Sequence, residues 1–160
     1  ACARFDLASP FLAPPAPHLL ARDEPLPRLA AFLAGAAEAF GEQAAVSASG
    51  ELERFADGLR QGALAAAMVP ADREAMPISG ATLIRAGGVA ELAGVWTRAG
   101  WRRRGHARAV CALLLERFFA EGGDVAWLSA GGTASVGLYR SLGFWPCGTQ
   151  LNYARPGARA

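Results

Sequence analysis

The stretch 100–110 reads GWRRRGHARAV and carries four arginines, with the small residues Gly105 and Ala107 placed among them. Apolar residues recur at steps of three and four positions after it, which predicts that a helix begins there. The first turn of a helix leaves backbone N–H groups unpaired at the positive end of the dipole, and a glycine lets a phosphate reach those amides. The spacing therefore indicates a phosphate site, although an arginine-rich first turn can also be a solvated surface.

Composition excludes several kinds of chemistry. All sixteen Lys and Arg positions of the 160-residue chain are arginines, so a phosphate-binding, Schiff-base or catalytic lysine is excluded. We expect no metal, because the cysteines and histidines of the chain have no metal-ligand spacing. These residues are Cys2, Cys111, Cys147, His18 and His106. A net charge of +2 is too small to indicate a nucleic-acid or membrane partner. No segment reads as a leader or a membrane span, and we expect a cytoplasmic protein with reduced thiols.

The elements that must position the arginine stretch follow from hydrophobic periodicity and from turn residues. Six prolines in residues 1–27 predict an irregular arm. The next pattern predicts a helix ending near Gly41, a short helix with Leu52, Phe55 and Leu59 on one face, a strand from Gly62 and a loop over 70–80.

The second half of the chain is expected to alternate strands and helices. The predicted elements are a hairpin over 81–97 turning at Gly87–Gly88, a helix from Gly105 to Gly122, a strand over 124–130, a short helix closed by Gly143 and a final strand over 144–153. Because helix, strand and helix alternate from Arg104 onward, part of the sheet should be parallel.

Residues 80–145 resemble the GNAT superfamily of acyl-CoA-dependent N-acetyltransferases. The family signature is glutamine or arginine, two residues, glycine, one residue, and glycine or alanine, which 102–107 match as RRRGHA. GVWTRAGW resembles the family's preceding strand and loop, with Ala99 where proline is frequent, and ASVGLYRSLGF resembles the end of the family's core. The resemblance implies an α/β (α+β) fold whose mixed, mostly antiparallel central sheet is splayed between its fourth and fifth strands and flanked by helices.

The resemblance also implies where acetyl-CoA, the family's co-substrate, would bind. Its pyrophosphate would lie against the signature loop: Arg102, Arg103, Arg104, Gly105, His106, Ala107 and Arg108. The pantetheine arm would pair with the strand backbone at Val95, Trp96 and Thr97. Many members carry an asparagine seven residues before the family's tyrosine, where this chain has Gly132, so Ser135, Thr133 or the backbone would have to replace that contact.

Two residues match catalytic positions of the family. Tyr139 matches the tyrosine that often protonates the thiolate of coenzyme A, although an aromatic residue on a short helix can simply pack in the core. Glu91, eleven residues before Arg102, has the spacing at which some members carry a glutamate base, although a strand glutamate near a hairpin can be merely solvated. At His106 the family uses the backbone, so we expect a surface histidine, and Cys111 should be inert in the core.

The function implied by the resemblance is an N-acetyltransferase that moves acetyl from acetyl-CoA directly to a primary amine of an acceptor that the sequence does not identify. One domain would span 1–160, with the arm at 1–27, an acceptor-side part at 28–79 and the acetyl-CoA-binding core at 80–153. A non-catalytic acyl-CoA-binding module is one alternative. A nucleic-acid-binding surface over Arg98–Arg108 is another, disfavoured because Trp101 is its only aromatic residue. We expect no membrane partner, and both a monomer and a homodimer remain open.

Overall fold

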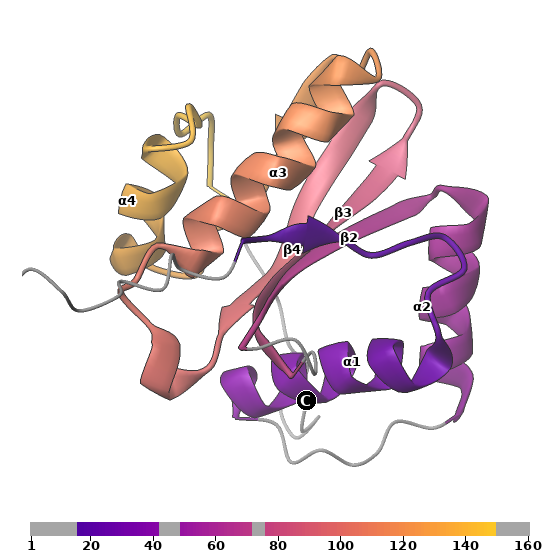
Figure 1. Ribbon diagram of the computed structural model, residues 1–160. Coiled ribbons are helices and arrows are strands. Elements are labelled where there is room, and N and C mark those ends of the chain that lie inside the picture. The colour runs from indigo at the N-terminus through magenta and orange to yellow at the C-terminus, as the bar shows by residue number, and fades with distance from the viewer. Residues whose placement is uncertain (1–15, 42–48, 72–75, 150–160) are drawn as a thin grey trace, which may run out of the picture.

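The computed structural model describes residues 16–41, 49–71 and 76–149 (Figure 1). Within these ranges the elements follow in the order β1 (His18–Leu19), α1 (Leu26–Phe40), α2 (Ser49–Gln61), β2 (Leu64–Pro70), β3 (Pro77–Ala86), β4 (Val89–Thr97), α3 (His106–Ala120), β5 (Val125–Trp127) and α4 (Thr133–Arg140). A short 3-10 turn, Ala99–Trp101, separates β4 from α3. Among these helices, none combines the length and apolar character needed to span a bilayer.

The strands of the described residues form one mixed sheet in the order β1-β2-β3-β4-β5. Neighbouring strands are antiparallel except β4 and β5, which are parallel because the α3 crossover returns the chain in the same direction. The expected hairpin joins β3 to β4, and its turn needs a glycine at position 87, where φ is +61°. The predictions of the hairpin and of a partly parallel sheet are confirmed.

The sheet opens between β4 and β5. The two strands pair only where Val89, Ala90 and Glu91 face Val125, Ala126 and Trp127. Beyond Glu91, β4 continues to Thr97, and no strand of the described residues pairs with this edge. The predicted splay between the fourth and fifth strands is therefore confirmed, and it leaves a stretch of backbone edge open beside the arginine-rich loop.

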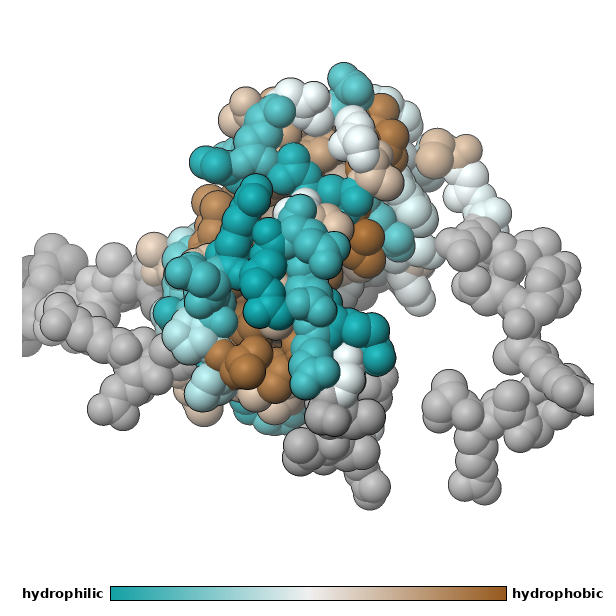
Figure 2. Space-filling model, turned by 90° about the vertical axis from the view of Figure 1, so that its right-hand side faces the viewer, coloured by the Kyte–Doolittle hydropathy of each residue, from teal (hydrophilic) through white to brown (hydrophobic). Residues whose placement is uncertain are grey.

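Helices cover the two faces of the sheet, with α3 and α4 on one side and α1 and α2 on the other (Figure 1). One core lies under α3 and includes Leu83, Leu92 and Leu114. The second core lies under α1 and α2 and includes Leu29, Phe32, Leu59 and Trp96. The charged side of α2 faces outward, and hydrophilic residues cover much of the middle of the surface on which α2 lies (Figure 2).

A bulge in β4 turns Trp96 from the α3 face to the α1 face. The register with β3 shifts between Gly80 and Thr82, and on the β4 side Gly94 takes a φ of +54°. Trp96 then packs edge-on against Phe32 of α1, with ring centroids 5.5 Å apart. A Cβ at Gly35 would lie 2.6 Å from the indole, and one at Gly80 would lie 2.8 Å from it, so both positions must stay free of a side chain. This contact fixes the open half of β4 against α1.

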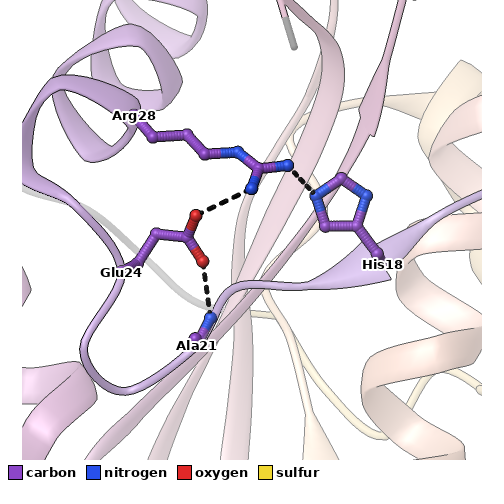
Figure 3. A network of polar contacts seen from close by, with 4 residues as sticks. All are labelled: His18, Ala21, Glu24 and Arg28. Atoms are coloured by element: carbon purple, nitrogen blue, oxygen red, sulfur yellow. Dashed lines mark hydrogen bonds and ion pairs between the residues drawn. The ribbon is translucent and has the colours of Figure 1, made fainter. Parts of the chain in front are cut away.

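Polar contacts attach β1 to α1 (Figure 3). An Arg28 guanidinium N–H donates to His18 Nε2 at 2.7 Å, and Arg28 Nη1 also donates to a Glu24 carboxylate oxygen at 3.0 Å. The other oxygen of Glu24 accepts the backbone N–H of Ala21 at 2.8 Å. The imidazole accepts a hydrogen bond from a cation here, so Nε2 must be unprotonated in the folded state.

Several element boundaries differ from the expectations. The strand β3 begins at Pro77, inside the segment expected to be a loop over 70–80, because a proline can occupy the first position of a strand without removing a needed donor. The end of the proline-rich arm contributes β1, and α1 includes Pro27 at its first turn. Residues 1–15 of the arm lie outside the described residues.

The last strands are shorter than expected. The strand predicted over 124–130 spans only Val125–Trp127, since β4 diverges there and offers no further partner. No strand forms over 144–149, where Pro146 lacks a backbone N–H, and the rest of the final strand predicted over 144–153 lies outside the described residues.

Candidate active site

The loop between β4 and α3 ends in an unprotected helix N-terminus. Gly105 is the N-cap residue, and no side chain caps it. The first helical bond runs from the Ala109 N–H to the Gly105 carbonyl at 3.0 Å, which leaves the N–H groups of His106, Ala107 and Arg108 without helical acceptors. These amides, at the positive end of the helix dipole, can hold an anion.

Two residues of the loop adopt left-handed backbone conformations. The φ angles are +64° at Arg103 and +83° at Gly105. Positive φ is costly for a residue with a Cβ, so Gly105 meets a conformational demand. A Cβ built at Gly105 would meet nothing within 4 Å, so no protein atom fills the space beside this position. Alternating backbone conformations of this kind turn successive N–H groups toward one concave side, as in anion-binding nests.

The arginines of the stretch divide by what they contact. Arg98 donates to the Pro77 carbonyl at 2.8 Å and pairs with the Glu38 carboxylate. Arg102 donates to the Thr97 carbonyl at 3.1 Å and to the Ala39 carbonyl at 3.2 Å. Both side chains therefore attach the loop to the end of α1 and to the strands.

The remaining arginines face outward. The Arg104 guanidinium lies over the Trp101 ring, 5.2 Å from its centroid, a cation–π arrangement. Arg103 and Arg108 are exposed, and no ion pair of the described residues involves them. These two side chains could supply charge and donors to a bound phosphate.

His106 is buried, so the expectation of a surface histidine was wrong. Only 5% of its surface is exposed, because position 106 is four residues before Val110 and shares the sheet-facing stripe of α3. Its ring lies 6.1 Å from that of Trp101, and its Nε2 has no hydrogen-bond partner in the described part of the chain. Burial, followed by the charge of Arg104, lowers the pKa of His106 below its usual value.

The open stretch of β4 uses its side chains for packing. Val95 contacts the core under α3, Trp96 is buried under α1, and Thr97 Oγ1 lies 2.9 Å from Ser79 Oγ. Only the backbone of these residues remains to pair with a ligand along the strand edge. The positions expected to meet pantetheine therefore carry side chains that are already occupied by the fold.

Glu91 stands at the last rung of the β4–β5 ladder, where the two strands begin to separate. It pairs with Ile84 on one side and Trp127 on the other, and its residue is half-buried. Its β4 neighbours Ala90 and Leu92 face the core under α3, so Glu91 faces the opposite side of the sheet. No ion pair of the described residues involves this carboxylate.

Tyr139, on α4, packs against the core on the α3 side of the sheet. Its ring makes an edge contact with Phe144 at 6.2 Å between centroids. Burial, with a smaller contribution from the nearby Cys111 thiol, raises the pKa of Tyr139, which keeps the phenol protonated at neutral pH. Burial likewise raises the pKa of Cys111 to about 12, as expected of an inert core thiol. Glu91 and Tyr139 thus approach the sheet from opposite faces.

Gly132, which stands where many members of the resembled family carry an asparagine, lies at the start of α4. The Ser135 hydroxyl donates to the Gly132 carbonyl at 2.7 Å, so its proton is engaged within the helix turn. Ser135 could then meet a ligand only as an acceptor, or after breaking this bond. The side chain of Thr133 lies outside the described residues.

Comparison with known proteins identifies the family of this chain. A family model described as the acetyltransferase (GNAT) family matches residues 48–144. The chain belongs to this family. It is therefore a GNAT acyltransferase, and the matched residues include the open edge of β4, the signature loop and both α3 and α4.

Solved structures share the GNAT fold at low sequence identity. A Trypanosoma brucei acetyltransferase is 18% identical, with a TM-score of 0.70 over 87% of this chain and 99% of that one. Glucosamine-6-phosphate N-acetyltransferase from Arabidopsis thaliana is 9% identical, with a TM-score of 0.69 over 87% and 98%. AAC(6')-Iy, solved with a bisubstrate analogue of coenzyme A and monomethyl-acetylneamine, is 16% identical, with a TM-score of 0.66 over 87% and 96%. Curated protein sequences give no match.

The GNAT signature residues 102–108 form the end of the loop that follows the open β4 edge and the first turn of α3. The structure also reveals residues that motif reasoning missed. Glu38 and Ala39, at the end of α1, hold Arg98 and Arg102, about sixty residues away in the chain. No local pattern around Glu38 signals this role, because the contact exists only once α1 has packed on the sheet.

Proposed function

We propose that this protein is an acetyl-CoA-dependent N-acetyltransferase that transfers acetyl directly to a primary amine. The observation that carries the proposal is the order of two features along the chain: the unpaired β4 edge over 92–97 is followed, after one 3-10 turn and a short loop, by the uncapped N-terminus of α3. An extended, amide-bearing chain can add to a strand edge, and a pyrophosphate can bind helix N–H groups. Coenzyme A carries both groups in this order.

The acyl group would then lie in the gap where β4 and β5 separate. The Glu91 carboxylate, on the α1–α2 face, accepts a proton from the acceptor amine. The amine nitrogen attacks the thioester carbonyl and the C–N bond forms. The nitrogen then releases its second proton to water as the C–S bond breaks. The Tyr139 phenol, on the opposite face, donates its proton to the departing thiolate and is reprotonated from solvent. In this arrangement the base and the acid serve opposite sides of the reacting carbon.

We propose a matching division of the chain. In this proposal one domain spans 1–160, residues 80–153 bind acetyl-CoA, and residues 28–79, which include α1 and α2, form the acceptor side. Glu91 faces the side of the sheet on which α1 and α2 pack, so an acceptor reaching this carboxylate would approach from there.

A thermal melt with millimolar acetyl-CoA tests the binding step. A ligand that binds only the native state stabilises it by RT ln(1 + [L]/Kd), about 2.7 kcal/mol at a hundredfold excess over Kd. We expect acetyl-CoA to raise the melting temperature more than ATP does, because ATP offers phosphates but no pantetheine. An equal shift with both ligands, or none with acetyl-CoA, contradicts the proposal.

An acceptor screen tests the chemistry. Purified protein is incubated with acetyl-CoA and a broad panel of amines, and released thiol is measured. We expect at least one amine to release thiol above the rate without acceptor. Binding of acetyl-CoA without thiol release across the panel would instead favour a non-catalytic acyl-CoA-binding module.

A further inference from the structure

A row of side chains crosses four strands on the face that carries α1 and α2. The Cα pairing places Leu64 opposite Ile84, Ile84 opposite Glu91, and Glu91 opposite Trp127. Paired residues on adjacent strands project from the same face of a sheet. Leu64 packs against the core under α1 and α2, which fixes the face of the whole row.

The helices cover only the first member of this row. Leu64 lies under α2, but the side chains further along the row are open, with 47% of Ile84 and 43% of Trp127 exposed. A second pair, Val89 and Val125, faces the same way two residues along and is also exposed. In the described part of the chain, the sheet therefore presents an apolar floor that the helices leave uncovered, formed by Ile84, Val89, Val125 and Trp127, with the Glu91 carboxylate at the edge of the gap between β4 and β5.

The Glu91 carboxylate determines which kind of ligand this floor can bind. An apolar partner surface laid over it would bury the Glu91 carboxylate without a counter-charge, which is costly. A protonated amine on an apolar skeleton would instead pair its charge with Glu91 and its carbon atoms with the floor. The exposed Trp127 ring offers an apolar face against which that skeleton can pack.

We propose that the acceptor is an amine carried on an apolar aliphatic or aromatic skeleton, and that Trp127 and Ile84 determine this specificity. The proposal rests on the acetyltransferase function proposed above. The amine lies at Glu91 beside the gap, and the skeleton extends over the Ile84–Trp127 floor, away from the acetyl-CoA loop. Amines on a polyhydroxylated skeleton gain no apolar contact with this floor.

The test compares phenethylamine and glucosamine as acceptors in the full-length protein. Each amine is assayed by thiol release and also titrated calorimetrically into the protein saturated with coenzyme A. We expect a higher kcat/KM and tighter binding for phenethylamine. Trp127→Ala should lower the kcat/KM and the affinity for phenethylamine by about tenfold each, since the contact between the Trp127 ring and the apolar skeleton is lost. The same two quantities for glucosamine should change by less than about twofold.

Matched variants separate this effect from general damage. Phe119→Ala removes an aromatic side chain of similar exposure, 47%, from α3 on the other face, and it should leave both acceptors unchanged. Ile84→Thr trims the floor without touching an aromatic ring and should reduce phenethylamine use selectively. Melting curves check that each variant is folded.

Each outcome is decisive. Equal use of the two amines, or equal losses for both in Trp127→Ala, overturns the apolar acceptor while leaving the acetyltransferase intact. If neither amine binds the coenzyme-A-saturated protein, the apolar acceptor is also overturned. If instead the proposed acetyltransferase function is wrong, acetyl-CoA itself neither binds nor releases thiol, which distinguishes the two failures. Conversion of a dimer to a monomer by Trp127→Ala in sedimentation would show that the floor is an interface between copies.

Discussion

Tyr139 lies on the α3 side of the sheet, and its phenol is protonated at neutral pH, so it has a proton to donate. Tyr139→Phe keeps the ring and its edge contact with Phe144, so packing should survive while the donated proton is lost. Loss of a general acid slows chemistry by roughly 10²–10⁴-fold. We expect that loss in kcat with little change in acetyl-CoA affinity, measured by steady-state kinetics and calorimetry. An unchanged kcat would remove Tyr139 from the mechanism.

Glu91 can be separated from Tyr139 by pH. A base is most needed at low pH, where the acceptor amine is protonated, and less needed as free amine accumulates. Glu91→Gln should therefore show its largest rate defect at low pH and a smaller defect as pH rises. Rates of the wild type and the variant are measured across pH with one amine. A defect that stays constant with pH would assign Glu91 to positioning instead of proton transfer.

At this scale the sequence predicted which elements carry the candidate residues better than it predicted the surroundings of their side chains. Glu91 lies on the second strand of the hairpin and Tyr139 on a short helix, as expected, and their catalytic roles stay predictions. The sequence did not predict that His106 is buried, because the family pattern describes the backbone there and not the direction of the side chain. That direction depends on the phase of α3, in which position 106 aligns with Val110.

The two ends of α3 allow a matched test of the helix N-terminus. Gly105 and Gly122 both have left-handed φ angles, +83° and +88°, and at both a Cβ would meet nothing within 4 Å. Alanine at either position should cost about 1–2 kcal/mol of stability through the same backbone strain. Only Gly105→Ala should also weaken acetyl-CoA binding, by about tenfold, since only there would the amides of the proposed site face the pyrophosphate.

Denaturation and calorimetric titration of both variants measure the two effects. His106→Ala is a poorer control, because truncating a buried ring also disturbs the packing beneath the loop. Equal losses of affinity in Gly105→Ala and Gly122→Ala would mean that strain, and not the helix terminus, controls binding.

Helices and strands were predicted well where hydrophobic periodicity is strong. They were predicted poorly where their bounds depend on contacts with neighbouring elements. The apolar stripe of α3 and the glycines after it were enough to place that helix. The strand β5 is shorter than its apolar run because its length is set by how far β4 stays alongside it. The bulge at Gly94, which turns Trp96 toward α1, also leaves no local signal, since a glycine inside a strand has several possible causes.

At the scale of the whole molecule, the two halves of the chain meet across the sheet. The second half supplies the open edge and the arginine-rich loop, whereas α1, from the first half, holds them through Trp96, Arg98 and Arg102. The positions of β1 and α1 therefore matter for the loop even though neither touches it through a catalytic group. Their mutual contact includes a titratable residue, which makes the stability of the fold depend on pH.

His18 should make the protein less stable as pH falls below about 6.5. Burial, followed by the charge of Arg28 and opposed by Glu24, lowers the pKa of His18 from its ordinary value of 6.5. His106 has a lowered pKa as well, through burial and Arg104. A lowered folded-state pKa means that the unfolded chain takes up the proton first, so the stabilisation is complete above 6.5 and is lost as pH falls toward the folded-state pKa.

In His18→Asn, the amide oxygen can still accept from Arg28 but cannot titrate. We therefore expect the free energy of unfolding, measured in urea, to fall less steeply in this variant than in the wild type between about pH 7.5 and pH 5. Carboxylates titrate in both proteins, so the difference between the two curves isolates His18. His106→Leu should flatten the curve further, because it removes the second histidine. Parallel curves for the wild type and His18→Asn would show that the contact between β1 and α1 does not depend on the protonation of His18.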